Sequence, residues 1–364
     1  MNKKFGFIVL IICLLLSLFS PVSVQAGDGL AILDSSVELD FPLKLNFYMS
    51  AESDVDITDI RLHYLVDRMS HAQVTSEIYI EFVPATAVDA GWSWDMRKTG
   101  GLPPGSSVKY WWTVEDAKGD TIGTEPTIFQ FDDARYSWRS LTEGMLTLYW
   151  YEGDESFARE LVNVAQQALA RLAKDTGAEL EEPIKIYIYD GAEDLLGAMI
   201  FPQEWTGGVA YTRHSTIAIG IEPNEIDWGK RAMAHELTHL VVHQMVFNPY
   251  SDLPTWLDEG IAMYNEGPLE PAFNALLKKA KAENNLISVR SLSSPFSAYA
   301  KESALAYAQS QSLVEFMITN YGQSKMLQLL STFREGSGYD EALKKVYGFD
   351  MDTLDSLWRS YLLK

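Results

Sequence analysis

Ala232-Met233-Ala234-His235-Glu236-Leu237-Thr238-His239-Leu240-Val241-Val242-His243 is the stretch that decides how the C-terminal half of this chain is built. Its core, His235 to His239, places two histidines four positions apart in an apolar run of helical period. Four helical residues turn the chain about 40° beyond one full turn and advance it about 6 Å, so both imidazoles face the same side. They can then bind one Zn²⁺ at about 2.0–2.1 Å while Glu236 lies beside the open position of the metal. The pattern predicts a zinc helix, and its apolar neighbours disfavour a merely solvated helix face.

A catalytic zinc ion needs a third protein ligand if one position is to stay open for water. Downstream, Pro254-Thr255-Trp256-Leu257-Asp258-Glu259-Gly260-Ile261-Ala262 begins another short helix. Here the sequence resembles the gluzincin clan of zinc peptidases, in which a Glu on a second helix completes the site. The Trp-Leu-x-Glu-Gly-x-Ala context is similar to the aminopeptidase N family, and the ensemble most resembles the peptidase MA-like domains of bacterial proteins.

The resemblance assigns a role to each matching position. It implies that His235, His239 and Glu259 bind one Zn²⁺ per chain and that Glu236 is the general base. Nineteen residues separate His239 from Glu259, one more than in the aminopeptidase pattern, so the connecting loop must differ.

Two neighbouring residues compete with this ligand set. Asp258 is adjacent to Glu259, but Thr255-x-x-Asp258 also has the form of a capping box, and the sequence favours that structural role. His243 is a further helix-spaced imidazole. It lies about 12 Å along the axis from His235, too far for both rings to bind one ion on a straight helix.

A tyrosine follows at Ala306-Tyr307-Ala308-Gln309-Ser310. In aminopeptidase N relatives a Tyr at the start of a comparable helix donates its hydroxyl to the developing oxyanion, and the resemblance gives that role to Tyr307. The Lys-Gly that follows the family's Tyr is replaced here by Gln309-Ser310. Packing on the helix is an equally good interpretation of Tyr307, and Tyr299 is the nearest rival.

One departure from the family bears on the substrate. Aminopeptidases of this family carry a Gly-x-Met-Glu-Asn segment whose Glu holds the free amino group of the substrate. The corresponding stretch here, Trp205-Thr206-Gly207-Gly208-Val209-Ala210-Tyr211, contains no acid. We therefore expect an endopeptidase, with an aminopeptidase as the alternative. Gly207 and Gly208 could let an edge strand approach a bound peptide, although a plain turn is as compatible with them.

Composition limits the partners. The 364 residues contain 29 Lys+Arg and 50 Asp+Glu, a net charge of -21, which disfavours binding to nucleic acid or to an acidic membrane surface. Residues 1–26 have a basic start, an apolar run and small residues before Gly27, which predicts a signal peptide cut after Ala26. An uncleaved signal anchor is the alternative. The only cysteine, Cys13, lies in this segment, so the secreted chain would have no disulfide and no stable membrane insertion.

The remaining chain divides into two predicted domains of α+β class. Short alternating runs at 43–47, 60–64, 77–82 and 108–114, separated by turns, predict an immunoglobulin or fibronectin-like β-sandwich over 27–135. Residues 136–364 contain a predicted helix at 155–172, strands at 184–189 and 215–221, and helical periodicity beyond 227. We expect a zincin-type catalytic domain there, a small mixed sheet followed by a helical lobe.

The resemblance implies a secreted zinc metallopeptidase that acts on peptides or proteins. A binding or adhesion protein in which the zinc is only structural is the alternative from another class. Glu236 distinguishes the peptidase from the binding protein, because it is not a metal ligand in this assignment and only catalysis requires it.

Overall fold

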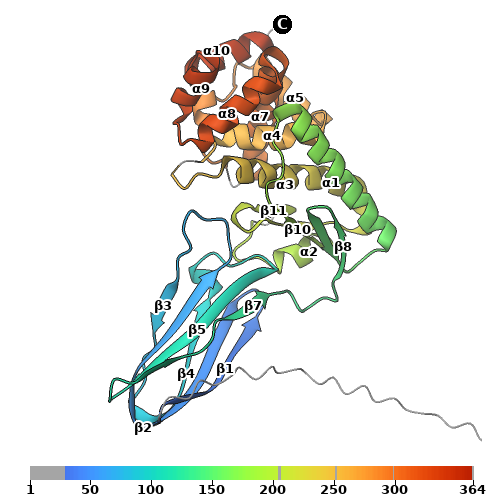
Figure 1. Ribbon diagram of the computed structural model, residues 1–364. Coiled ribbons are helices and arrows are strands. Elements are labelled where there is room, and N and C mark those ends of the chain that lie inside the picture. Colours follow the sequence, from blue (N-terminus) through green and yellow to red (C-terminus); the bar gives the residue numbers. More distant parts are fainter. Residues whose placement is uncertain (1–28, 204–205, 251, 298, 363–364) are drawn as a thin grey trace, which may run out of the picture.

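The computed structural model describes residues 29–203, 206–250, 252–297 and 299–362. The predicted signal peptide lies outside these residues. A strand-rich N-terminal part and a helical C-terminal part lie at opposite ends of the molecule, with a second sheet between them (Figure 1). The α+β class expected from the sequence is confirmed. Within the described ranges, none of the helices combines the length and apolar character needed to cross a membrane.

The N-terminal sheet has seven strands, all paired antiparallel: β1 (Ala31–Asp40), β2 (Lys44–Val66), β3 (Ser76–Tyr79), β4 (Ala85–Asp95), β5 (Ser106–Asp116), β6 (Thr121–Gly123) and β7 (Thr127–Phe131). The first part of β2 pairs with β1 and β4, and its second part pairs with β3 and β5. The predicted strands at 43–47 and 60–64 therefore belong to one strand of 23 residues. The sequence predicts two strands and a turn here, but the chain stays extended, with a register shift relative to β4 between Glu52 and Ile57.

The second sheet has five strands in the order β11 (Gly208–Tyr211), β12 (Thr216–Gly220), β10 (Ile184–Tyr189), β9 (Leu146–Trp150) and β8 (Arg139–Glu143). The three inner strands are parallel, and both edge strands are antiparallel to their neighbours. The predicted mixed sheet is thus confirmed, with its strands at 184–189 and 215–221. The edge strand β11 contains one of the two glycines of the Gly207-Gly208 pair.

Alternation along β10 gives this sheet two different faces. Ile184, Ile186 and Ile188 are buried in the main core, which the helices complete. Tyr187 and Tyr189 lie in a separate aromatic cluster on the opposite face. Because successive strand side chains point to opposite faces, the Ile-x-Ile-Tyr-Ile-Tyr pattern places the helical lobe and the aromatic layer on either side of the sheet.

The helices are α1 (Glu155–Thr176), α2 (Gly191–Leu196), α3 (Ile226–Val246), α4 (Thr255–Glu266), α5 (Pro271–Ala282), α6 (Val289–Leu292), α7 (Ala300–Tyr321), α8 (Gln323–Arg334), α9 (Tyr339–Tyr347) and α10 (Met351–Leu362), with short 3₁₀ turns at Met96–Lys98, Thr212–His214 and Pro223–Glu225. The helix predicted at 155–172 is confirmed as part of α1. Asp154 caps its start by accepting a hydrogen bond from the backbone N–H of Phe157 at 3.0 Å. Helix α3, which carries the two histidines, packs against α1 and α4.

Candidate metal centre

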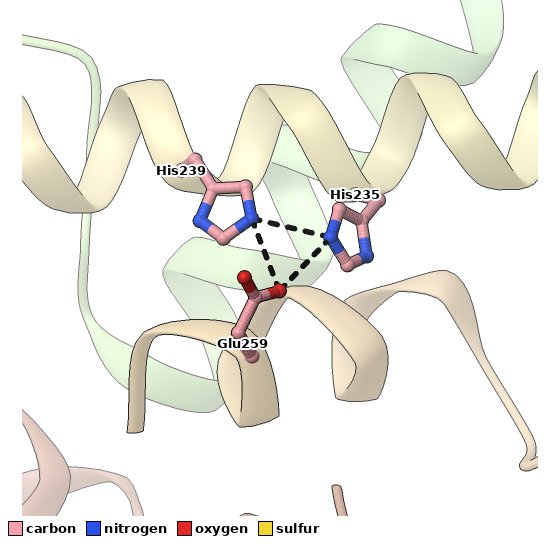
Figure 2. A group of neighbouring side chains, drawn as sticks. All are labelled: His235, His239 and Glu259. Carbon is pink, nitrogen blue, oxygen red and sulfur yellow. Dashed lines mark hydrogen bonds and ion pairs between the residues drawn. The ribbon is translucent and has the colours of Figure 1, made fainter. Parts of the chain in front are cut away.

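Two helices bring the predicted ligands together. His235 and His239 lie one turn apart on α3, and Glu259 points at both of them from α4 (Figure 2). One ligand atom from each residue lies within 4.8 Å of the others. Helix α4 is held in place by its contact with α7, where a Cβ on Gly260 would lie 2.5 Å from the carbonyl oxygen of Ser310. Only glycine allows α4 and α7 to approach this closely. Gly260 therefore helps to fix the position of α4, and with it the position of the neighbouring Glu259.

The spacing of the three donor atoms suits a tetrahedral metal ion. The Nε2 atoms of His235 and His239 are 3.2 Å apart, and they lie 3.3 Å and 3.5 Å from Oε2 of Glu259. Tetrahedral bonds of about 2.0–2.1 Å separate neighbouring ligand atoms by about 3.3–3.4 Å. Oε2 of Glu259 is buried and lacks a partner with hydrogen-bond geometry among the described residues, although both rings are this close. A buried oxygen aimed at two imidazole nitrogens fits a shared cation.

Carboxylates orient both imidazole rings from the other side. Nδ1 of His235 lies 2.8 Å from Oε1 of Glu266, and Nδ1 of His239 lies 2.9 Å from Oδ1 of Asp258. Since a carboxylate only accepts, each Nδ1–H donates, and each Nε2 faces the shared position, where a bound metal ion would take its lone pair. Arg231 holds the second oxygen of Glu266 at 2.9 Å.

The capping role predicted for Asp258 is wrong. Helix α4 begins at Thr255 after Pro254, and its start has no side-chain cap from the described residues. Asp258 instead bridges two imidazoles, because its Oδ2 also accepts a hydrogen bond from Nε2 of His243 at 3.0 Å. His239, His243 and Asp258 form a second group with metal-ligand spacing, but here the carboxylate is hydrogen-bonded to both rings.

The imidazoles and carboxylates of the site stabilise one another's charged forms. Although burial opposes it, the two neighbouring imidazoles lower the pKa of Glu259 to about 2. Burial also disfavours a charged His235, yet the carboxylates of Glu259 and Glu266 raise its pKa to about 9. Burial raises the pKa of Glu236. The pocket therefore stabilises positive charge between the ligand atoms, as a bound cation would supply it.

A cavity of about 620 Å³ opens beside these residues and is lined by His235, Glu236, His239, Glu259 and Tyr307. Burial, together with the nearby carboxylates, raises the pKa of Tyr307, so its hydroxyl remains a hydrogen-bond donor at neutral pH. The rival, Tyr299, is 72% exposed and does not line the cavity. Of the two tyrosines, the structure brings only Tyr307 to the site.

The edge strand β11 forms another wall of the same cavity. Gly207 and Gly208 line it, and a Cβ on Gly208 would lie 3.0 Å from both Cγ and Oε1 of Glu236. The absent side chain leaves room for the Glu236 carboxylate beside the strand. Thr206 to Tyr211 are described in this stretch, whereas Trp205 is not.

Two residues that support the site, Glu266 and Arg231, belong to none of the motifs found in the sequence. Glu266 follows Glu259 by seven positions on α4, and Arg231 precedes His235 by four on α3. Helical periodicity would have placed each on the same face as its ligand. Their pairing could not be inferred, because it depends on how the two helices cross.

The family model of the Peptidase MA superfamily matches residues 164–364, which include the whole site. The chain belongs to the Peptidase MA superfamily. The resemblance inferred from the sequence is thus confirmed. A search of curated proteins finds no match to this superfamily member.

The solved structures that match this Peptidase MA chain are distant from it. The M1 zinc metallopeptidase from Deinococcus radiodurans is 12% identical, with 93% of this chain and 95% of that chain covered and a TM-score of 0.39. Wild-type OgpA from Akkermansia muciniphila is 9% identical over 28% of this chain and 27% of its own, with a TM-score of 0.22. Neither likeness assigns a residue of this chain.

Proposed function

We propose that this Peptidase MA protein is a zinc-dependent peptidase with one Zn²⁺ held by His235, His239 and Glu259. The observation that carries the proposal is the triangle of donor atoms, whose sides of 3.2, 3.3 and 3.5 Å match tetrahedral zinc ligation. Oε2 of Glu259, which is buried and has no hydrogen-bond partner among the described residues, supports the same assignment. A zinc ion supplies Lewis-acid polarisation of a carbonyl and lowers the pKa of water.

The residues of the chain supply the proton transfers and the orientation. Glu236 lines the cavity and takes the proton of the attacking water as general base, then passes it to the leaving amine. Its raised pKa suits a group that must both accept and return a proton near neutral pH. Tyr307 donates its hydroxyl to the oxyanion that develops on the scissile carbonyl.

The substrate is a peptide, and internal cleavage is favoured. The exposed backbone of β11 at the edge of the sheet can pair with an extended peptide beside Glu236. Glu266 and Glu270 also line the cavity, but both are paired with Arg231, at 2.9 Å and 3.1 Å. Both oxygens of Glu266 are occupied, Oε1 by His235 and Oε2 by Arg231, so this carboxylate is not a free acceptor for a substrate amino group, which supports an endopeptidase over an aminopeptidase.

We propose a role for each of the three segments of the chain. Residues 1–26 direct secretion and are removed after Ala26. Residues 27–135 form an immunoglobulin or fibronectin-like sandwich that positions the substrate or attaches the enzyme, and 136–364 form the catalytic domain. This division is supported by two cores, one drawn from the N-terminal strands with Ile200 packed against it and the other from Leu141 onward.

Zinc content and cleavage of a denatured protein substrate test the proposal in the secreted chain. We expect one zinc per chain and cleavage in the parent. Glu236→Gln should keep the zinc and lose activity by about a hundredfold or more. Glu259→Gln should lose the zinc. Equal cleavage by the parent and Glu236→Gln, or a parent without stoichiometric zinc, would refute a catalytic zinc and favour a binding protein.

A second assay separates the two kinds of peptidase. The same peptide is offered with a free and with an acetylated amino terminus, and the cut sites are mapped. Internal cuts in both peptides support the endopeptidase. Stepwise loss of residues from the free peptide alone would show an aminopeptidase.

A further inference from the structure

A second cavity, of about 380 Å³, lies between the N-terminal sheet and the catalytic part. One wall is formed by residues 68–74 of the connection between β2 and β3, and the facing wall includes Arg213 and His214 of the 3₁₀ turn after β11. The backbone N–H of Met69 donates to the carbonyl oxygen of Arg213 at 2.7 Å and joins the two walls. The volume is within the range of small-molecule sites, about 300–1,000 Å³.

The lining of this cavity has the opposite charge to the chain as a whole. Arg68, His71, Arg213 and His214 line it, and its described lining includes no Asp or Glu. The chain itself has 50 acidic and 29 basic residues. Two arginines without a lining carboxylate, in so acidic a protein, concentrate positive potential at one place.

Arg68 and Arg213 differ from every other arginine of the described chain. Neither makes an ion pair or a side-chain hydrogen bond with a described residue, whereas each remaining arginine bonds a carboxylate or a backbone carbonyl: Arg61, Arg97, Arg135, Arg139, Arg159, Arg171, Arg231, Arg290, Arg334 and Arg359. These two guanidinium groups, which have no such partner in the part of the chain that the structure describes, line the same cavity. They are free to bind an external anion.

A buried ring nitrogen of His214 is a second, independent observation at this cavity. Its Nδ1 is buried and has no hydrogen-bond partner among the described residues. Burial lowers the pKa of His214 to about 4, and the charges of Arg68 and, to a smaller extent, Arg213 lower it in the same direction. The charge of Asp67 opposes this shift. Both arginines are therefore near His214, and the ring is neutral at pH 7. Buried polar atoms in proteins are almost always paired, and this Nδ1 can meet that requirement by donating a hydrogen bond to an anion in the cavity.

We propose that this cavity binds a small molecule that carries a carboxylate or phosphate group on an apolar body. Arginine forks bind such oxyanions in paired hydrogen bonds. The rings of Tyr64 and Trp94, whose centroids are 4.7 Å apart, line the side formed by the N-terminal sheet and offer an apolar contact. A ligand held by Arg68 on one wall and Arg213 on the other connects the two parts of the chain.

Calorimetric titration of the full secreted chain tests this site with phenyl phosphate and benzoate as probes and benzylamine as the cationic comparison. We expect saturable binding of at least one anion and none of benzylamine. The Arg68→Gln/Arg213→Gln double variant should weaken that binding about tenfold or more. Lys118→Gln, which removes one positive charge from the exposed β5–β6 turn, should leave it unchanged.

The two anions distinguish the ligand classes, because tighter binding of one assigns the site to phosphates or to carboxylates. An anion that binds instead at the proposed zinc site retains its affinity in the double variant. The proposal would be overturned if the double variant bound the anions with the affinity of the parent, or if the parent bound neither anion saturably. Circular dichroism melting confirms that the variants fold, and each single substitution is titrated in case the double variant does not.

Discussion

Asp258 orients His239 from behind, with its Oδ1 2.9 Å from the Nδ1 of the ring. The other oxygen of the carboxylate accepts from His243 at 3.0 Å. The imidazoles lower the pKa of Asp258 although burial opposes it, so the carboxylate stays charged at neutral pH. A charged acceptor on Nδ1 raises the basicity of Nε2 and fixes the ring for metal binding.

Removal of this carboxylate should weaken the metal site without removing a ligand. We expect Asp258→Ala to lower zinc affinity about 10- to 100-fold, the usual cost of losing such an outer partner. Competition with a chromophoric chelator measures the affinity. His243→Gln is the control, because it removes the other partner of Asp258 and leaves His239 bonded, so its effect should be smaller. A larger loss in His243→Gln than in Asp258→Ala would contradict this role.

Tyr307 and Tyr299 form a matched pair for the oxyanion role. Tyr307 lines the active-site cavity, whereas Tyr299 is 72% exposed. We expect Tyr307→Phe to lower kcat about ten- to a thousandfold, as loss of one oxyanion donor does, with zinc content unchanged. Tyr299→Phe should keep the parent kcat. If Tyr307→Phe has the activity of the parent, Tyr307 only packs against its neighbours, such as the ring of Phe296.

The parts of the site that one helix determines could be predicted from the sequence. The spacing of His235 and His239 is set by the helix itself, and the structure has both on one face of α3. The true role of Asp258 was missed because a Thr-x-x-Asp pattern at a helix start satisfies a local rule, while its partners belong to another helix. Which rule applies depends on how α3 and α4 pack, and no local pattern contains that information.

Long-range contacts also explain why β2 is one strand although the sequence predicts two. The run from Leu43 and the run from Ile60 each alternate, and polar residues between them suggested a turn. Ser53 in that interval is buried, and its hydroxyl donates to Asp116 on the end of β5 at 2.9 Å. A contact across 63 positions satisfies the polar side chain and lets β2 continue. Alternation identifies strands, but long-range pairing decides where they end.

Gly208 tests whether β11 must pass close to the general base. A Cβ there would lie 3.0 Å from Oε1 of Glu236, so we expect Gly208→Ala to displace the carboxylate and lower kcat about tenfold or more. Zinc content should not change, because Glu236 is not a ligand. Gly338→Ala is the control, since nothing lies within 4 Å of its added Cβ. Parent kcat in Gly208→Ala would show that the approach is not needed.

His214 should make the protein sensitive to acid. Burial and the charge of Arg68 lower its pKa in the folded chain from 6.5 to about 4, so between these values the unfolded chain binds a proton that the folded chain does not. The free energy of unfolding is therefore unaffected by His214 above about pH 6.5 and falls as the pH drops towards 4. At about 1.4 kcal/mol per unit of pKa, the loss reaches at most about 3.5 kcal/mol. Urea unfolding at pH 7.5, 6.0 and 5.0 measures it.

The comparison that decides this prediction is the slope with pH, because substitution can change the absolute stability. His214→Gln should lose less unfolding free energy between pH 7.5 and 5.0 than the parent does. His71→Gln, an exposed histidine lining the same cavity, leaves His214 in place and should keep the parent slope. If parent and His214→Gln lose the same free energy over this range, His214 is not the group whose protonation opposes folding, and its burial has no thermodynamic consequence.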